Sequence, residues 1–247
     1  MTTLAERWAR LEPSVVVVRP EGPGPFPTVL VFPGCGGVRS HLDRYAGAAV
    51  AAGWMVVRIE SFTARGWSDA FTRTFICTGL LFRGAERAGD VMAAVAGVRS
   101  LPSVDPERLV LAGWSHGGWA IMDMMTLSLD HGAAGISDAP SLDLTGVVGA
   151  FLPYPYVGFP AASRSHDWKR PMRSFFILPT RDHLATMRLY ERALDHVRAP
   201  GSPVETWVVK ATHAFDEPGL TDKHILNDPG LTGQAIERFA GFLKTCA

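Results

Sequence analysis

Short apolar runs alternate with longer segments of helical composition along most of the chain. The apolar runs are rich in β-branched residues and are bounded by Gly or Pro, which is typical of strands. One longer segment, 41–53, ends on a glycine, the residue that commonly follows a helix C-terminus. The predicted strands are 14–20, 28–34, 54–60, 108–113, 145–152, 173–180 and 205–211. The predicted helices are 41–53, 83–100, 116–130, 186–197 and 233–245.

This alternation predicts one α/β domain over residues 1–247, with a mostly parallel, doubly wound sheet flanked by helices. The run 108–113 does not alternate apolar and polar positions, so we expect a strand that is buried on both faces. Two connections, 61–82 and 152–173, are too long for simple turns and are rich in aromatic residues. Because ligands bind beyond the carboxyl ends of parallel strands, we expect both connections to border a binding site.

Composition excludes several classes of protein. The 247 residues carry 24 Lys and Arg against 24 Asp and Glu, so no basic excess is available to bind nucleic acid or an anionic membrane. No apolar run approaches the roughly 18 residues that span a bilayer, and the N-terminus lacks the apolar stretch of a signal peptide. The three cysteines, Cys35, Cys77 and Cys246, lack a metal-binding spacing and favour a cytoplasmic location with reduced thiols.

The candidate nucleophile is Ser115, which lies in the sequence Gly-Trp-Ser-His-Gly between a predicted strand and a predicted helix. In this context G-x-S-x-G predicts a nucleophile elbow, a strained turn that exposes the serine hydroxyl at the end of the sheet. The pattern by itself also occurs by chance, so the strand before it and the helix after it carry the prediction. The alternative is a glycine-rich helix start with Ser115 as its N-cap.

A serine hydroxyl needs a general base, and the base needs an acid that orients it. On this type of sheet the order is Ser, acid, His, and the acid and the histidine follow later strands. Asp182 follows the strand 173–180 and His213 follows the strand 205–211, so we predict these two as acid and base. Three other residues compete for these roles. Asp167 precedes its strand and so lies at the wrong end of the sheet, His183 is expected in a turn, and His224 lies in a polar segment.

Two backbone amides are predicted to bind the oxyanion of a tetrahedral intermediate. One belongs to His116, directly after Ser115, and such a donor contributes about 2.7–4 kcal/mol to transition-state stabilisation. The other is expected from the glycine-rich segment 32–40, where Cys35 is best placed to offer its N–H. A nucleophilic Cys35 is the alternative, but no histidine stands in the right relation to it.

With these residues in place, the chain resembles the dienelactone hydrolase-like branch of the α/β-hydrolases from about residue 28 to 243. The resemblance depends on FPGCGG, VDPERLVLAGWSHGGWA, PTRDH and THAFD, with SFTARG followed by Cys77 as weaker support. It implies a Ser/Cys-Asp-His hydrolase with a small, loop-lined pocket, no large lid domain and no metal or organic cofactor. Dienelactone hydrolases proper carry a cysteine nucleophile and a donor-loop glutamate, where this chain has Ser115 and Gly34. A serine carboxylesterase is therefore favoured.

The predicted reaction is cleavage of a small carboxylic ester through an acyl-enzyme intermediate. Lactonase or dienelactone hydrolase, thioesterase and peptidase activities on the same triad are alternatives, as is a non-catalytic binding protein of the same fold. The expected partner is a small-molecule ester or lactone. Nucleic acid and membrane are not expected partners, and a homodimer is left open.

Aromatic residues near the predicted site favour an aromatic-walled pocket. The substrate-binding candidates are Trp67, Tyr154, Tyr156 and the elbow residue Trp114, with packing of the loops onto the sheet as the alternative for each. Arg65 and Arg73 could pair with a substrate carboxylate, although solvent exposure is favoured for both. Cys77 is expected to be a small buried hydrophobe.

Overall fold

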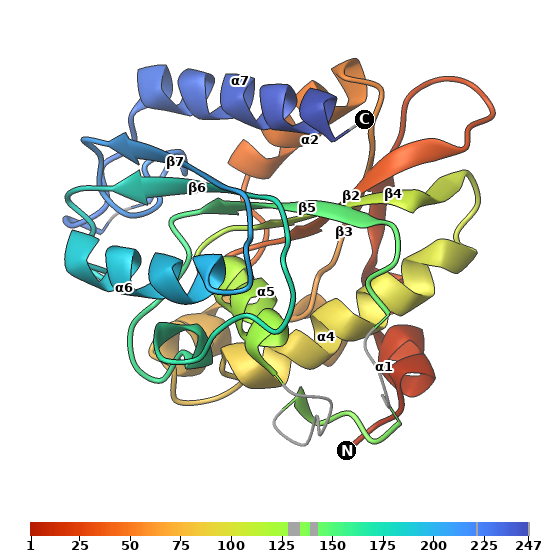
Figure 1. Cartoon of the computed structure of the whole chain (residues 1–247), viewed down its shortest axis with the longest axis horizontal. Helices are drawn as coiled ribbons and strands as arrows, with labels where there is room; N and C mark the ends of the chain where they lie inside the picture. Colours follow the sequence, from red (N-terminus) through yellow and green to blue (C-terminus); the bar gives the residue numbers. More distant parts are fainter. Residues whose placement is uncertain (128–133, 139–142, 221, 247) are drawn as a thin grey trace.

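The structure, a computed structural model, describes residues 1–127, 134–138, 143–220 and 222–246 (Figure 1). The strands are β1 (Val16–Val18), β2 (Phe26–Phe32), β3 (Met55–Arg58), β4 (Val104–Gly113), β5 (Val147–Pro153), β6 (Ser174–Pro179) and β7 (Val204–Val209). Within the described residues these seven form one sheet in the order β1-β3-β2-β4-β5-β6-β7. All neighbours run parallel except β1, which pairs antiparallel with β3 at one edge. The predicted mostly parallel sheet is confirmed.

Helices cover both faces of the sheet (Figure 1). One face carries α2 (His41–Ala51) and α7 (Pro229–Thr245), and the other carries α1 (Leu4–Leu11), α4 (Gly84–Gly97), α5 (His116–Thr126) and α6 (Met187–Arg198). A short α3 (Asp69–Phe71) lies in the connection after β3. The predicted helix 116–130 corresponds to α5, and its residues 128–130 lie outside the described part of the chain.

β4 explains how the fold positions a site. Leu109 and Leu111 belong to the apolar cluster on the α4 face, while Val110 and Ala112 belong to the cluster beneath α2 and α7. Burial on both faces accounts for the unbroken apolar run in the sequence. Because β4 lies in the middle of the sheet, the turn that follows it places Ser115 at the centre of the carboxyl edge.

The N-terminal helix α1 was not among the predicted elements, although the sequence carries a start signal for it. The Thr3 hydroxyl accepts a hydrogen bond from the Glu6 amide, and the Glu6 carboxylate accepts one from the Thr3 amide, which is a capping box. Trp8 then packs over Gly97 of α4, where a Cβ would clash with the indole.

Helix α7 begins four residues before the predicted start at residue 233. Asp228 is its N-cap and accepts a hydrogen bond from the Leu231 amide at 2.9 Å, and Pro229 occupies the first helical position. Both residue types are favoured there because the amides of the first turn have no acceptor within the helix. Proline has no such N–H to leave unpaired, and the aspartate side chain accepts a hydrogen bond from one of the others. The signal was therefore present in the sequence.

A buried charge network fixes α4 to the N-terminal region. The Asp90 carboxylate accepts hydrogen bonds from Arg7 at 2.9 Å and from both terminal nitrogens of Arg65 at 2.8 and 2.9 Å. The Arg65 side chain is only 9% exposed. Neither expectation for Arg65, a substrate carboxylate partner or a solvated surface residue, is correct, because its fork matches an internal carboxylate instead.

Candidate active site

Ser115 lies at the sharp turn between β4 and α5. Its backbone has φ +49° and ψ −110°, a conformation that costs a non-glycine residue free energy unless packed surroundings hold it. A Cβ on Gly117 would clash with the Phe32 carbonyl oxygen, and one on Gly113 would lie 2.6 Å from the Gly117 carbonyl carbon. The Ser115 side chain makes no capping hydrogen bond to α5. The turn thus has the geometry of a nucleophile elbow.

His213 and Asp182 reach Ser115 from the loops that follow β7 and β6. The His213 Nε2 lies 2.8 Å from the Ser115 Oγ, and its Nδ1 lies 2.7 Å from the Asp182 Oδ2. An ionised carboxylate can only accept, so Nδ1 carries the hydrogen and Nε2 is free to accept the serine proton. The structure brings together the three side chains that the sequence analysis selected, all three of them buried.

The Asp182 carboxylate is held by several donors. Its Oδ1 accepts from the amides of Leu184 and Ala185 at 2.8 and 3.2 Å, and its Oδ2 also accepts from the Tyr190 hydroxyl at 2.6 Å. Burial raises the pKa of Asp182, but His213 and these donors outweigh it, so the pKa lies below its ordinary value. Asp182 is therefore ionised at neutral pH and fixed in orientation.

A second buried carboxylate, Asp216, lies close to this group and was not selected from the sequence. It accepts hydrogen bonds from the hydroxyls of Tyr45 and Tyr154 and from the Trp114 indole at 3.3 Å. The Tyr154 ring in turn packs edge-on against the His213 imidazole, with centroids 4.9 Å apart. The Asp in HAFD, three residues after the histidine, was the only available signal.

The predicted oxyanion segments lie beside the serine. A Cβ placed on Gly34 would lie 3.6 Å from the Ser115 Cβ, so the segment that contains Cys35 passes next to the candidate nucleophile. In the described part of the chain, neither the Cys35 amide nor the His116 amide donates a hydrogen bond to another protein group. Free amides at this place are what an oxyanion site requires.

A buried carboxyl group, Glu217, also approaches this segment. Its Oε1 would lie 3.9 Å from a Cβ on Gly34, and it lies 3.9 Å from the Nε2 of His41. Burial and the neighbouring Asp216 raise the pKa of Glu217 to about 8, although Arg39 opposes the shift. Glu217 is therefore mostly uncharged at neutral pH, and no sequence pattern around it indicates its burial.

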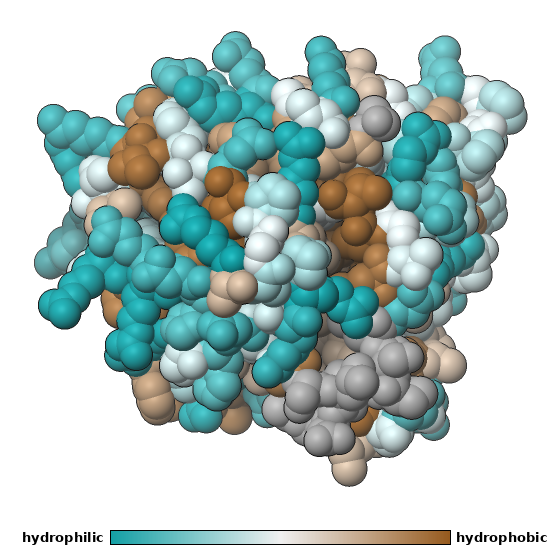
Figure 2. Space-filling view, viewed as in Figure 1, coloured by the Kyte–Doolittle hydropathy of each residue, from teal (hydrophilic) through white to brown (hydrophobic). Residues whose placement is uncertain are grey.

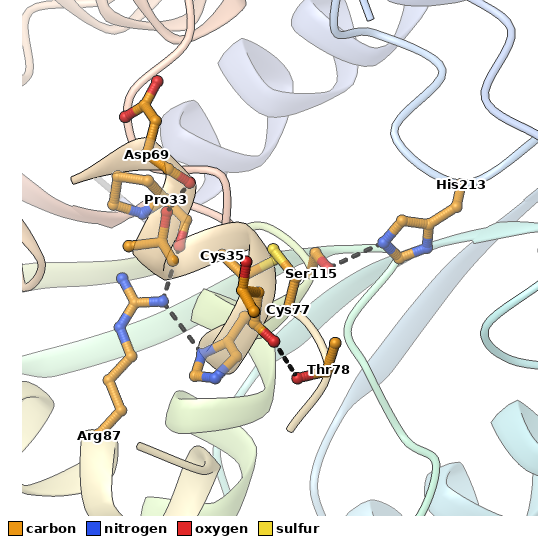
Figure 3. The surroundings of a disulfide bond; sticks show 11 residues. Pro33, Cys35, Asp69, Cys77, Thr78, Arg87, Ser115 and His213 are labelled. Atoms are coloured by element: carbon orange, nitrogen blue, oxygen red, sulfur yellow. Dashed lines mark hydrogen bonds between the residues drawn. A yellow bond between two sulfur atoms is a disulfide. The ribbon is translucent and has the colours of Figure 1, made fainter. Parts of the chain in front are cut away.

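Cys35 is joined to Cys77 by a disulfide across 42 residues (Figure 3). The expectation that Cys77 is a small buried hydrophobe is wrong: the residue is exposed and bonded, because the connection 61–82 folds back over the glycine-rich segment. The bonded Cys35 sulfur is also not available as a nucleophile. Disulfides persist in oxidising compartments, so the cysteines no longer support the predicted cytoplasmic location.

Two of the four substrate-binding candidates do not face a pocket. Trp114 is fully buried and packs against Tyr45, with ring centroids 4.9 Å apart, and against Phe239. Tyr154 is equally buried, between Asp216 and His213. Both predictions are wrong for the same reason: at these positions the chain directs the side chain into the apolar cluster beneath α2 and α7.

The other two candidates, Trp67 and Tyr156, are partly exposed. Trp67 packs against Phe71 and Phe82 at centroid distances of 5.2 and 5.3 Å. The Tyr156 ring lies 4.9 Å from the Trp119 ring, and its hydroxyl donates to the carbonyl of Phe159 at 2.7 Å. These contacts show that both rings stabilise their loops, and a role in substrate binding stays a prediction.

The competing residues make no hydrogen bond to the Ser115 group, although the His183 ring lies edge-on to the His213 ring at a centroid distance of 6.0 Å. Asp167 bonds His196 of α6 at 2.6 Å, with the Asp167 side chain 60% exposed. The rings of His183 and His224 stack on each other, with centroids 5.3 Å apart, and both residues are exposed.

No group of three or more His, Cys, Asp or Glu side chains among the described residues could hold a metal ion. Among the same described residues, no helix has the length and apolar character to cross a membrane. On the face drawn in Figure 2, hydrophilic side chains surround small, separate hydrophobic patches.

Solved structures share this architecture. The dienelactone hydrolase-like promiscuous phosphotriesterase P91 from metagenomic libraries has a TM-score of 0.70 at 14% identity, over 94% of this chain and 98% of that chain. The thermophilic esterase Est2 of Thermogutta terrifontis, with propionate bound, has a TM-score of 0.65 at 14% identity, over 93% and 88%. At such identities the likeness establishes the fold. The protein has the α/β-hydrolase fold.

The sequence model of the dienelactone hydrolase family matches residues 14–246, and the chain belongs to this family. A Synechocystis protein provisionally named carboxymethylenebutenolidase is 28% identical over 111 residues, which are 42% of this chain and 45% of that protein. A Fusarium vanettenii protein provisionally named dipeptidyl-aminopeptidase B is 34% identical over 108 residues, 42% of this chain and 11% of that protein. The matched part thus spans less than half the length of either curated relative.

Proposed function

We propose that this protein is a serine hydrolase that cleaves small carboxylic esters through an acyl-enzyme intermediate. The observation that carries the proposal is the continuous hydrogen-bonded chain from the Ser115 hydroxyl through His213 to Asp182. A serine hydroxyl is a weak nucleophile, and an adjacent imidazole held by a carboxylate supplies the base that it needs. A purely binding protein would have no use for this arrangement.

In the proposed reaction, the Ser115 Oγ attacks the ester carbonyl carbon while His213 takes the hydroxyl proton. The amides of Cys35 and His116 bind the oxyanion, and each such donor typically contributes about 2.7–4 kcal/mol. His213 then gives its proton to the departing alcohol, and later removes one from the water that hydrolyses the acyl-enzyme. Asp182 holds the imidazole in the required tautomer and stabilises its protonated form.

Two departures from dienelactone hydrolases proper favour an ordinary ester as substrate. The nucleophile is Ser115 where those enzymes carry a cysteine, and Gly34 stands where they carry a glutamate. A lactone, a thioester or an aminoacyl amide could react at the same serine, and a substrate panel separates these alternatives.

The test compares wild type with Ser115→Ala on p-nitrophenyl acetate and butyrate, a lactone, a thioester and an aminoacyl anilide. Ser100→Ala is the matched control, because the hydroxyl of this exposed serine donates to the Gly97 carbonyl and takes no part in the Ser115 group. We expect ester turnover by wild type and the control, and its loss in Ser115→Ala with an unchanged melting temperature. Activity of Ser115→Ala within a few-fold of wild type would refute the proposal.

A further inference from the structure

Arg87 is a fully buried cation that bonds both segments on which the proposed oxyanion donors stand. We propose that Arg87 is a positioning residue that aligns the amides of Cys35 and His116 for the transition state. This inference rests on the proposed function, because an oxyanion site is required only if the serine attacks a carbonyl group.

The contacts of Arg87 converge on the candidate site from α4. Its Nη1 donates to the Pro33 carbonyl oxygen at 2.9 Å and lies 3.2 Å from the His116 Nδ1, while its Nε donates to the Ser61 hydroxyl at 3.3 Å. Figure 3 shows the guanidinium directed at Pro33, on the segment that continues to the disulfide beside Ser115. One nitrogen therefore links the two separate parts of the oxyanion site.

The bond to His116 also determines the state of that imidazole. Burial and the adjacent guanidinium lower the pKa of His116 to about 3, so the ring is neutral. Arginine can only donate, so the His116 Nδ1 accepts and the ring hydrogen resides on Nε2. Arg87 thereby fixes the orientation of the residue whose backbone N–H is the proposed oxyanion donor.

The bond to Pro33 restrains the other donor. Proline has no backbone N–H, so its carbonyl oxygen is the only backbone group through which Pro33 can be held by a hydrogen bond. Only Gly34 separates this fixed carbonyl from the Cys35 amide, and glycine allows its neighbours wide rotational freedom. The anchor at Pro33 and the disulfide at Cys35 hold this segment on either side of Gly34.

The choice of partners separates Arg87 from a merely structural arginine. Buried cations that stabilise a fold are normally paired with carboxylates, as Arg7 and Arg65 are with Asp90 on the same helix. Arg87 takes part in none of the ion pairs within the described residues, and its Nη2 has no hydrogen-bond partner there. Apart from the Phe62 ring, whose centroid lies 4.6 Å from the guanidinium carbon, the groups that Arg87 contacts belong to the two donor segments and to Ser61.

Burial lowers the pKa of Arg87 to about 9, with Asp90 opposing and Arg65 reinforcing the shift. The group is therefore still protonated at neutral pH. A fixed positive charge behind the donors stabilises an oxyanion more than a neutral ester carbonyl, since preorganised charge acts where charge develops. The effect of Arg87 should appear in kcat rather than in KM.

The experiment measures kcat and KM for a p-nitrophenyl ester, and the rate of labelling by a fluorophosphonate, in Arg87→Met, Arg87→Lys and Arg7→Met. Arg7→Met is the matched control, because it also removes a buried guanidinium, but one that bonds Asp90 and touches neither donor segment. All assays run well below the lowest melting temperature of the set.

We expect Arg87→Met to lose about 10–100-fold in kcat and in labelling rate, because small misplacements of catalytic groups have effects of this size, with KM changed less than about threefold. Arg87→Lys should recover part of the loss, and Arg7→Met should keep kcat within about twofold.

Equal losses of kcat in Arg87→Met and Arg7→Met, or unchanged kcat in Arg87→Met, would overturn the assignment. If Arg87→Met does not fold, His116→Ala removes one of the acceptors of Arg87 and keeps the backbone amide. It should lower kcat with little change in KM, and an unchanged kcat would equally overturn the inference. Ester turnover and labelling that depend on Ser115 but not on Arg87 would leave the proposed function intact and reject only the positioning role. Turnover independent of Ser115 would reject the proposed function itself.

Discussion

The ring of Tyr154 packs edge-on against the imidazole of His213, and the Tyr154 hydroxyl donates a hydrogen bond to the buried carboxylate of Asp216. Asp216 thus anchors the surface on which the proposed base rests. Two further donors, Tyr45 and Trp114, satisfy the same carboxylate. A single acidic residue therefore joins α2, the elbow and the loop after β5 beneath His213.

Removing one of these donors should lower the stability of the fold and leave substrate binding nearly unchanged. Tyr154→Phe leaves a buried carboxylate with one hydrogen bond fewer, which costs about 1–3 kcal/mol of unfolding free energy. KM should change little, because Tyr154 does not line a pocket. Tyr156→Phe is the control, since its hydroxyl bonds a carbonyl at a partly exposed site, and denaturant unfolding of both variants compares them. Equal stability losses in the two variants would contradict the anchoring role.

Asp182 should be needed for the correct tautomer of His213. Asp182→Asn places a donor where an acceptor is required, which turns the imidazole over and lowers kcat by about 10⁴-fold in related triads. Asp167→Asn offers a matched control, because Asp167 also bonds a histidine, His196, away from the site. Steady-state ester hydrolysis measures both. A loss of less than about tenfold in Asp182→Asn would argue against this role.

Glu217 should make the protein less stable as the pH rises. Burial raises its pKa from 4.5 to about 8 in the folded chain, so the folded state holds a proton that the unfolded state has released between these values. Unfolding free energy therefore falls between about pH 4.5 and 8 and levels off above, by about 3–5 kcal/mol in total from this group.

Glu217→Gln cannot ionise and should lose this part of the pH dependence, so its stability relative to wild type should increase from pH 5 to pH 9. Glu237→Gln, at an exposed position on α7, is the control and should follow the wild-type curve. Denaturant unfolding at five pH values is sufficient. Parallel curves for wild type and Glu217→Gln would show that the carboxyl is not buried in solution.

Breaking the disulfide should affect both stability and turnover. It closes a loop with ends 42 residues apart, and a cross-link of this span stabilises by about 4 kcal/mol through the unfolded state. Cys77→Ser should lower the unfolding free energy by up to this amount and reduce kcat, because Cys35 loses one of its two restraints. Cys246→Ser, which removes the free cysteine, should change neither quantity. Unchanged kcat in Cys77→Ser would leave the disulfide with a structural role alone.

The sequence predicted the features that depend on local pattern and chain order. The unbroken apolar run before Ser115 indicated a central strand, and the positions of Asp182 and His213 after later strands indicated where acid and base would meet it. The start signals of α1 and α7, a capping box and an Asp-Pro pair, are equally local. These features require no knowledge of which distant segments touch.

The remaining features depend on tertiary contacts. No local sequence pattern indicates which way the side chains of Trp114 and Tyr154 point. The pairing of Cys35 with Cys77 requires the connection 61–82 to fold over the donor segment. Arg87 resembles any other charge on a helix until Pro33 and His116 are seen around it. The division into one domain and the cytoplasmic location stay predictions.

The most direct measurement of the central claim is peptide mapping by mass spectrometry after reaction with a fluorophosphonate. The account predicts one adduct, on Ser115, formed rapidly by wild type and at least about 100-fold more slowly by His213→Ala, because the base activates the hydroxyl. An adduct on another residue, or equal labelling of Ser115 in His213→Ala, would contradict it.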